Sequence, residues 1–145
     1  MKLAMLSDLL NSDIQLSDLY KLYNKEEENQ EEISVEKQVS KLLYDLALAP
    51  SYKGYKYLKE AVTMLCEDSM DYDSITKDLY PAVAAKFETT AQNVEKNIRF
   101  AIRKIYEFNT PENLERLLGR SPALSSKPSN VKFIACCAEK IRLER

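Results

Sequence analysis

Residues 89–105 read TTAQNVEKNIRFAIRKI, and this stretch decides the fold class that we expect for the chain. Thr89 followed three residues later by Gln92 is typical of a helix start, because two such side chains can cap each other's backbone N–H groups. Apolar side chains then recur at helical spacing within an arc of about 100°: Ala91, Val94, Ile98, Ala101, Ile102 and Ile105. The pattern predicts an amphipathic helix with one packing face.

The opposite face of this predicted helix is polar and cationic. It carries Gln92, Lys96, Arg99 and Arg103, with Asn93, Glu95 and Phe100 beside them. Such donors can reach base edges and phosphates in DNA. We therefore expect the recognition helix of a helix-turn-helix, from about Thr90 to Ile105. Taken alone, the stretch fits an ordinary surface helix with a solvated basic face better, because charged outer faces are common on helices.

Composition favours an all-α protein with one domain of ordinary size. The chain has 145 residues, 45% of them hydrophobic, and only two glycines. Long periodic runs dominate, and no segment alternates convincingly as a β-strand would. No apolar run is long enough to span a membrane, and the N-terminus does not follow a signal-peptide pattern. We expect a cytoplasmic protein with no membrane partner.

Residue types exclude several kinds of catalytic and metal site. The sequence has no histidine, which excludes imidazole metal sites and Ser-His or Cys-His catalysis. Its three cysteines, Cys66, Cys136 and Cys137, form no CxxC pair, and we interpret Cys66 and Cys137 as core thiols in a reducing compartment. Because no acid/base pair suggests catalysis, we expect a protein that is not an enzyme and needs no cofactor.

The charge distribution divides the chain near residue 33. Residues 1–34 contain three lysines and eight acidic residues, a net charge of −5, whereas residues 35–145 contain eighteen basic and fifteen acidic residues, a net charge of +3. This asymmetry indicates a mildly basic domain with an acidic extension. We expect an acidic, helical N-terminal extension and linker at 1–32 and a helix-turn-helix effector domain at 33–145.

Two short amphipathic pieces make up most of the extension. The first places Leu3, Leu6, Leu9 and Leu10 on one side; the second starts at Ser17, a candidate N-cap, and carries Leu16, Leu19, Tyr20, Leu22 and Tyr23. Each is too short to be a stable helix alone in water. They must therefore pack on the domain, on each other or on a partner. Residues 24–32, with five glutamates, are typical of a solvated linker or a mobile helix end.

Start and stop signals predict six helices in the domain. One is the recognition helix, and two precede it in the chain, from the Ser34 cap to about Leu48 and at 54–67. Ser74 is predicted to cap the next helix, in which Pro81 makes a kink or a fresh turn. The last two helices are expected at 112–118, between Thr110-Pro111 and Gly119, and from Asn130 to about Leu143.

Several motifs in this order resemble one known family. They are KGYKYLKEA at 53–61, SITKDLYP at 74–81, AKFETTA at 85–91, KPSN at 127–130, FIA at 133–135 and RLE at 142–144. Residues 36–145 resemble the C-terminal DNA-binding effector domain of the master sporulation response regulator of endospore-forming bacteria, the stage zero sporulation protein A family. The resemblance implies a six-helix domain whose third and fourth helices form the helix-turn-helix. It also implies tandem binding to a short DNA box and contact with an RNA polymerase sigma factor.

The sequence also departs from this family. Residues 1–35 are too short for the family's phosphoacceptor receiver domain, so we expect no phosphorylation control of that kind within this chain. Glu95 and Arg99 match the family pattern, whereas Asn93 and Lys96 stand where the family usually has arginines. Arginine offers guanine a two-pronged donor, lysine offers a point charge and asparagine prefers adenine. These replacements predict either a different DNA box or weakened binding. Phe100 replaces a polar residue and can touch a thymine methyl or a neighbouring protomer.

We assign candidate roles to three groups of residues. The base-facing group is Gln92, Asn93, Glu95, Lys96, Arg99 and Phe100. The phosphate-facing group is Lys86, Thr89, Thr90, Arg103, Lys104, Lys127 and Lys132, although solubility and helix capping explain these residues as well. Glu115 and Arg116 resemble the family's polymerase-contacting region, and a plain structural helix is the alternative there.

The leading hypothesis is a DNA-binding transcription regulator that inserts its recognition helix into the major groove of double-stranded DNA as a homodimer or tandem pair. The alternative is a protein-interaction module or an antagonist of the full-length regulator. In that case the acidic extension would mask the recognition helix or replace DNA binding.

Overall fold

The computed structural model describes residues 16–21, 33–68, 75–119 and 127–144, and the chain divides into two units, Met1–Ile33 and Ser34–Arg145. In the first unit residues 16–21 are helical, with Leu16 and Tyr20 exposed. Ser17 lies inside this helix, so the prediction that it is the N-cap is wrong. The predictions for Leu3 to Leu10, for Leu22 and Tyr23, and for the linker at 24–32 fall outside the described residues.

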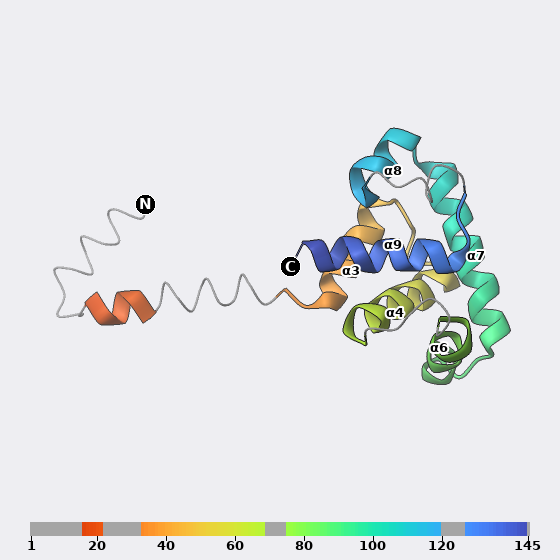
Figure 1. Ribbon diagram of the computed structural model, residues 1–145, viewed down its shortest axis with the longest axis horizontal. Helices are drawn as coiled ribbons and strands as arrows, with labels where there is room; N and C mark the ends of the chain where they lie inside the picture. Colours follow the sequence, from red (N-terminus) through yellow and green to blue (C-terminus); the bar gives the residue numbers. More distant parts are fainter. Residues whose placement is uncertain (1–15, 22–32, 69–74, 120–126, 145) are drawn as a thin grey trace. The chain divides into compact units, whose positions relative to one another are not determined.

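The described part of the second unit consists of helices (Figure 1). Their order is α3 (Val35–Asp45), α4 (Lys53–Glu67), the π-helix η1 (Ile75–Leu79), α6 (Tyr80–Lys86), α7 (Ala91–Phe108), α8 (Pro111–Leu118) and α9 (Asn130–Leu143). The predicted all-α class is confirmed. Within the residues that the structure describes, six helices of this unit are α-helical, and α6 and α7 are the third and fourth of them.

Two of the predicted N-caps hold their helices as expected. Ser34 Oγ accepts a hydrogen bond from the Lys37 backbone N–H at 3.2 Å, and Thr110 Oγ1 accepts one from the Asn113 N–H at 3.1 Å. Each side chain satisfies an N–H group that has no partner inside its helix. The chain leaves α8 through Gly119 at φ 87°, a conformation that glycine adopts without strain.

Helix α3 is shorter than the sequence predicts, because it ends at Asp45 and not near Leu48. Ala47 adopts φ 60°, and the Leu48 N–H turns back to donate to the Leu43 carbonyl oxygen at 3.1 Å. This is a Schellman closure, in which the left-handed residue ends the helix. Periodicity missed it because Leu46 and Leu48 are buried even though they lie beyond the helix.

The segment around Pro81 changes from one type of helix to another, and Pro81 lies at the start of the second, which agrees with the predicted fresh turn. The π-helix η1 ends at Leu79, and α6 begins with Pro81 in its first turn. Proline is tolerated there because the first N–H groups of a helix have no intrahelical acceptor. Ser74, the predicted cap, lies outside the described residues.

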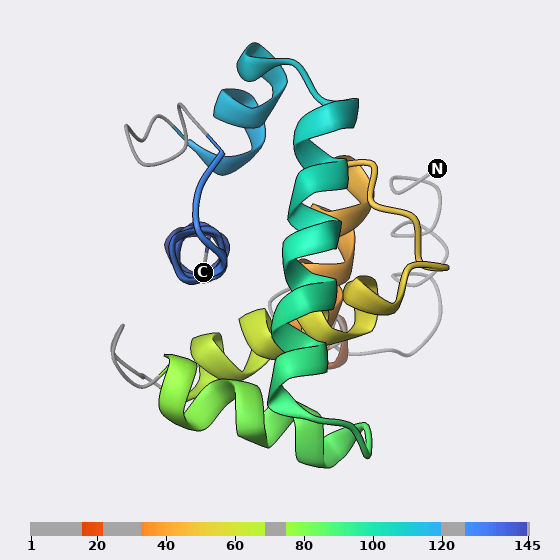
Figure 2. The ribbon, with the colours of Figure 1, turned by 90° about the vertical axis from the view of Figure 1, so that its right-hand side faces the viewer.

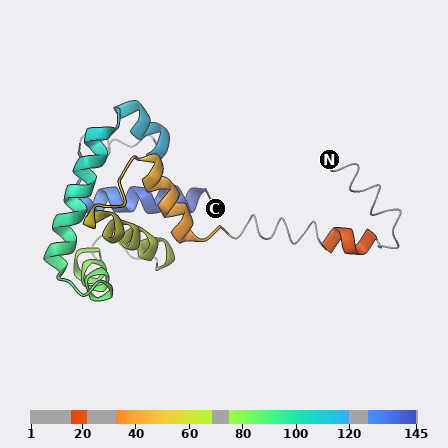
Figure 3. The same cartoon turned by 180° about the vertical axis from the view of Figure 1, so that it is seen from behind.

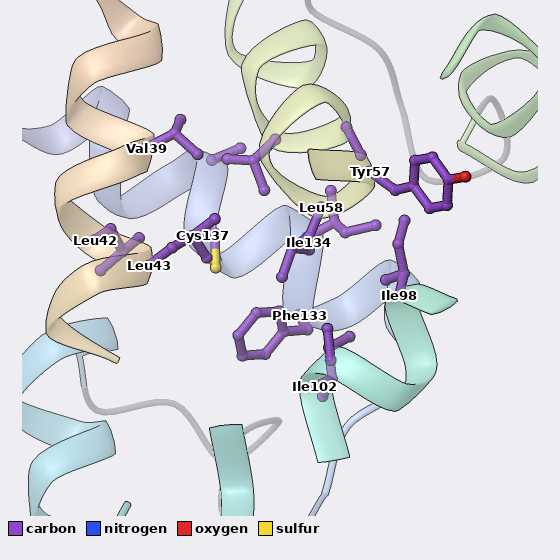
Figure 4. Packing of buried hydrophobic residues seen from close by; sticks show 14 of the residues in the cluster. Val39, Leu42, Leu43, Tyr57, Leu58, Ile98, Ile102, Phe133, Ile134 and Cys137 are labelled. Atoms are coloured by element: carbon purple, nitrogen blue, oxygen red, sulfur yellow. The ribbon is translucent and has the colours of Figure 1, made fainter. Parts of the chain in front are cut away.

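Helix α9 lies at the centre of the domain and organises the core. It crosses between α8 and α4, with α3 on the far side in Figure 1 and on the near side in Figure 3. Its Phe133, Ile134 and Cys137 pack among side chains of α3, α4 and α7 (Figure 4). This packing supports α7 from behind and leaves its other face available. None of the helices in the described ranges has the length and apolar character needed to cross a bilayer.

Candidate nucleic-acid interface

The turn between α6 and α7 is short and closed by hydrogen bonds. Glu88 adopts φ 53°; its N–H donates to the Ala85 carbonyl oxygen at 3.4 Å, and the Thr89 N–H donates to the Ala84 carbonyl oxygen at 2.9 Å. These two bonds form a second Schellman closure. The sharp change of direction lets α6 run across one end of α7, as Figure 2 shows.

Thr90, not Thr89, caps the start of α7. Thr90 Oγ1 accepts from the Asn93 backbone N–H at 3.1 Å, whereas Thr89 Oγ1 accepts from the Asn93 side-chain Nδ2 at 2.8 Å. The predicted capping pair of Thr89 and Gln92 is therefore wrong by one residue. The helix also continues past Ile105 to Phe108.

The two faces of α7 separate as the hydrophobic pattern predicts. The apolar positions Val94, Ile98, Ala101, Ile102 and Ile105 are at most 1% exposed. On the opposite side Gln92, Lys96, Arg99 and Arg103 are all exposed. We name these four residues the polar stripe. It forms an open surface along the helix.

Several of the cations near the polar stripe already have carboxylate partners. Arg99 forms an ion pair with Glu95 one turn earlier, and Lys104 Nζ lies 3.1 Å from Glu107 Oε2. Lys86 donates to Glu60 Oε2 at 2.7 Å, and this hydrogen bond raises the pKa of Lys86. Gln92, Lys96 and Arg103, in contrast, have no hydrogen-bond or ion-pair partner among the residues that the structure describes.

Asn93 is turned away from the polar stripe. Its side-chain amide donates to Thr89 Oγ1 at 2.8 Å and to the Tyr57 hydroxyl at 3.4 Å, and its Oδ1 accepts from Asn97 Nδ2 at 2.9 Å. The side chain is half-buried as a result. Of the six predicted base-facing residues, Asn93 is thus the one whose polar atoms point into the domain.

Phe100 forms one border of the polar stripe. Its ring meets the Tyr52 ring edge-on, with centroids 5.6 Å apart, and Lys104 Nζ lies 5.4 Å from the Phe100 centroid. The ring remains 39% exposed. The start of α4 therefore flanks this side of the stripe, which the sequence pattern did not predict.

An open groove of about 390 Å³ forms the other border, between α7 and the start of α9. Asn130 Nδ2 donates to the Glu95 backbone oxygen at 3.0 Å and joins the two helices. Burial raises the pKa of Tyr80 in the groove wall, and a hydrogen bond with Asn130 partly opposes this rise. The lining residues are Tyr80, Glu95, Arg99, Lys127, Pro128, Ser129, Asn130 and Val131.

The predicted phosphate-facing lysines Lys127 and Lys132 are both exposed; Lys127 lines this groove, and Lys132 follows the last lining residue, Val131, in α9. Ser129, between them, caps α9 by accepting from the Lys132 backbone N–H at 3.3 Å. Sequence reasoning missed Tyr80, Ser129 and Val131 as neighbours of Arg99 in the groove, because they lie in α6 and at the start of α9, far from Arg99 along the chain. The KPSN motif at 127–130 was the available signal.

A further exposed lysine, Lys56, lies at the helix-turn-helix corner and was not predicted. Its Nζ is 5.2 Å from the Phe87 ring centroid and 5.5 Å from the Tyr57 centroid. Lys86 approaches the same Phe87 ring at 5.8 Å. Two cations from different helices thus gather on one aromatic ring at the turn, in the geometry of cation–π contacts.

The candidate polymerase surface lies on α8, where Glu115 and Arg116 are both exposed. Arg116 donates to Asn113 Oδ1 at 2.6 Å. Asn109, just before α8, donates to the Leu46 backbone oxygen at 2.7 Å and to the Ile105 oxygen at 2.8 Å. These bonds join the end of α7, just before α8, to the end of α3.

The cysteines have the environments of structural thiols. No disulfide joins any two of them; Cys66 and Cys136 are half-buried, whereas Cys137 is buried, and burial raises the pKa of its thiol. Cys66 Sγ donates weakly to the Ala138 backbone oxygen at 3.7 Å. Among the described residues, no group of three or more His, Cys, Asp or Glu side chains is arranged to hold a metal ion.

Comparison with known protein families agrees with this arrangement. Residues 39–141 match the family model described as sporulation initiation factor Spo0A C terminal. The match spans α4, the helix-turn-helix, α8 and most of α3 and α9, and so covers well over half of the chain. The chain therefore belongs to the family of the C-terminal, DNA-binding effector domain of sporulation initiation factor Spo0A.

Proposed function

We propose that this protein is a cytoplasmic, sequence-specific transcription regulator that inserts α7 into the major groove of double-stranded DNA. The observation that carries the proposal is the exposed polar stripe on α7, in a chain that belongs to a DNA-binding family. The major groove of B-DNA is wide enough to admit one α-helix. An exposed donor-rich face opposite a fully buried one suits that position.

Arg99, Lys96 and Gln92 are the proposed base contacts. Arg99 can donate to guanine O6 and N7, and Gln92 can pair with the adenine edge. Glu95 has two proposed roles, acceptance from a cytosine amino group or orientation of Arg99. The ion pair between Glu95 and Arg99 supports the second role.

Phosphate contacts are proposed on both sides of the polar stripe. A helix in the major groove has a phosphate backbone on each side of it, so cations at both borders are expected. Lys127 and Lys132 lie at the α9 border, and Lys86 and Lys56 lie at the helix-turn-helix corner. Arg103 continues the stripe.

The proposal has two further parts. The protein binds DNA as a homodimer or tandem pair, and Glu115 and Arg116 contact an RNA polymerase sigma factor. The exposure of both α8 side chains supports the second. Sedimentation of the protein with duplexes carrying one or two boxes tests the first. A charge reversal, Arg116→Glu, that lowers transcription in vitro without lowering DNA affinity would support sigma contact; unchanged transcription would contradict it.

Fluorescence anisotropy with random duplexes at low salt, followed by selection of the preferred sequence, tests the main proposal. Arg99→Ala is expected to cost about 1–3 kcal/mol of binding free energy on the selected duplex. Lys37→Ala, which removes an exposed cation from α3, is the matched control and should leave affinity nearly unchanged. Indifference of the wild-type protein to every duplex would reject the function.

A second candidate function is masking of DNA binding by the acidic extension. Leu16 and Tyr20, one helical turn apart, are 75% and 67% exposed, so this short helix presents apolar surface that a partner can cover. Residues 1–34 also carry the net charge of −5 that a cationic surface attracts. Removal of residues 1–33 should raise DNA affinity sharply if the extension masks α7, and unchanged affinity would argue against masking.

A further inference from the structure

We infer that Asn93 is a positioning residue and does not read a base, so that sequence discrimination on α7 falls to Gln92, Lys96 and Arg99. This inference rests on the proposed function and assigns the roles of individual residues within it. It also separates this chain from the pattern that its family motif implies at position 93.

The hydrogen-bonding groups of the Asn93 amide are already in use within the domain. Recognition of adenine by asparagine needs one N–H donor and the carbonyl acceptor of the same amide at the same time. Both hydrogens of Asn93 Nδ2 are directed to oxygens inside the domain, Thr89 Oγ1 at 2.8 Å and the Tyr57 hydroxyl at 3.4 Å. Its Oδ1 accepts from Asn97 Nδ2 at 2.9 Å.

A change of the Asn93 rotamer would break these bonds. Turning Asn93 toward DNA would leave Thr89, Tyr57 and the half-buried Asn97 without these partners. A partly buried polar group that loses its hydrogen bond without gaining another destabilises the fold. Gln92, Lys96 and Arg103 are exposed donors on α7 that need no such rearrangement, because they have no competing partner among the described residues.

The Asn93 bonds also join the elements that set the direction of α7. Thr89 belongs to the helix-turn-helix turn, Tyr57 belongs to α4, and Asn97 lies in the next turn of α7. The Asn93 backbone N–H is also the group that the Thr90 side chain caps. One residue thus ties the turn, α4 and the first two turns of α7 together, and so holds the polar stripe in position on the domain.

The test compares base preference with overall affinity. The wild-type protein is first used to select its preferred duplex, and each position of that duplex is then changed in turn. Affinities for this panel are measured for the wild type, Asn93→Ala, Asn97→Ala and Lys96→Ala, at a temperature at which circular dichroism shows each variant folded. Asn97→Ala leaves the Asn93 side chain in place but removes the partner of its carbonyl.

Asn93→Ala is expected to weaken binding to every duplex by the same factor, roughly three- to tenfold, and to leave the order of preference unchanged. Asn97→Ala should act in the same direction, and the double variant should lose less than the product of the two single losses. Lys96→Ala should instead flatten the preference at one or two positions. A purely structural role would lower the melting temperature but leave the affinity of the folded variants unchanged.

A direct spectroscopic readout uses the wild-type chain. On titration with the selected duplex, the side-chain amide signals of Asn93 in a ¹⁵N–¹H spectrum should move little, whereas the Gln92 amide signals should move strongly. Three results would each overturn this inference but leave the proposed function standing. They are loss of preference at a single base position in Asn93→Ala, unchanged DNA affinity of that folded variant, and a large shift of the Asn93 signals on DNA binding. A wild-type protein that binds no duplex would overturn the proposed function as well.

Discussion

A methyl group placed on Gly54 would lie 2.1 Å from the backbone carbonyl oxygen of Asn97, so α4 and α7 meet backbone to backbone at this point. The same methyl would lie 2.8 Å from the Ala101 side chain. Only glycine permits so close an approach without moving a helix. This contact holds α7 against α4 directly behind the polar stripe.

Gly54→Ala is therefore expected to lower the free energy of unfolding by roughly 3 kcal/mol, because a helix backbone cannot move aside as a flexible side chain can. Urea denaturation measures the loss. Gly119→Ala is the control: its methyl would meet nothing within 4 Å, and only the φ of 87° opposes it, so a loss of about 1 kcal/mol is expected. Equal losses in the two variants would contradict the close approach of α4 and α7.

Glu88→Gly is expected to stabilise the domain by roughly 0.5–1 kcal/mol, because a glycine relieves the left-handed conformation that closes α6. Thermal or urea unfolding detects the gain. Ala47→Gly relieves the same left-handed backbone conformation at the end of α3, far along the chain from the helix-turn-helix. It should increase the free energy of unfolding by a similar amount. If both variants are less stable than the wild type, the two Schellman closures at the ends of α3 and α6 are wrong.

Lys127→Ala is expected to reduce the salt dependence of DNA binding. If Lys127 neutralises one phosphate, the slope of log affinity against log salt concentration should become shallower by about 0.9. Base preference should not change, because a phosphate contact carries no sequence information. Lys140→Ala, on the last turns of α9 and paired with Glu144 at 3.2 Å, is the matched control and should leave the slope unaltered. An unaltered slope in Lys127→Ala would remove this residue from the interface.

Glu95→Gln is expected to increase affinity for random duplexes and to reduce discrimination of the preferred one. The change removes a carboxylate that phosphates repel, and it removes the partner that orients Arg99. A gain of roughly 1 kcal/mol for random DNA is consistent with one charge near a protein surface. Glu107→Gln, which releases Lys104 further along α7, should change discrimination much less. Anisotropy with preferred and random duplexes checks both variants, and sharper discrimination in Glu95→Gln would exclude an orienting role for Glu95.

Stability is expected to fall as the pH rises above about 9. Burial raises the pKa of the Cys137 thiol above its ordinary value of 9.0 and raises the pKa of Tyr106 to about 12 from 10.0. The unfolded chain therefore releases these protons at a lower pH than the folded chain. For each group, the free energy of unfolding falls as the pH rises from the pKa of the unfolded state to the pKa of the folded state. Urea midpoints at pH 8 and pH 10.5 measure the fall. Tyr106→Phe should make it shallower, and a midpoint that does not change with pH would show that these groups titrate alike in both states.

Sequence periodicity was sufficient for the helical fold class and for most helix boundaries. Ser34, Thr110 and Gly119 marked helix ends correctly, and the span of α9 was predicted from its own residues. Capping and amphipathic spacing involve residues within one or two helical turns of each other, so they can be recognised in the sequence without knowledge of the fold. The start of α7 was wrong by one residue, and the ends of α3 and α7 were each wrong by three residues, because the backbone conformation at a helix end is not fixed by hydrophobic spacing.

The environment of each side chain at the interface depended on tertiary structure. The spacing of α7 placed Asn93 beside the polar stripe, but its amide turns inward, to Thr89 at 2.8 Å within the same stretch and to Tyr57 of α4 at 3.4 Å. Likewise, Lys86 pairs with Glu60, which lies 26 positions away in the sequence. The open groove that Lys127 lines forms only because α9 packs beside α7. The sequence by itself determined which face of each helix is apolar. Only the packing of one helix against another decided which polar atoms remain available to a partner, because hydrogen bonds between distant residues form after the helices meet.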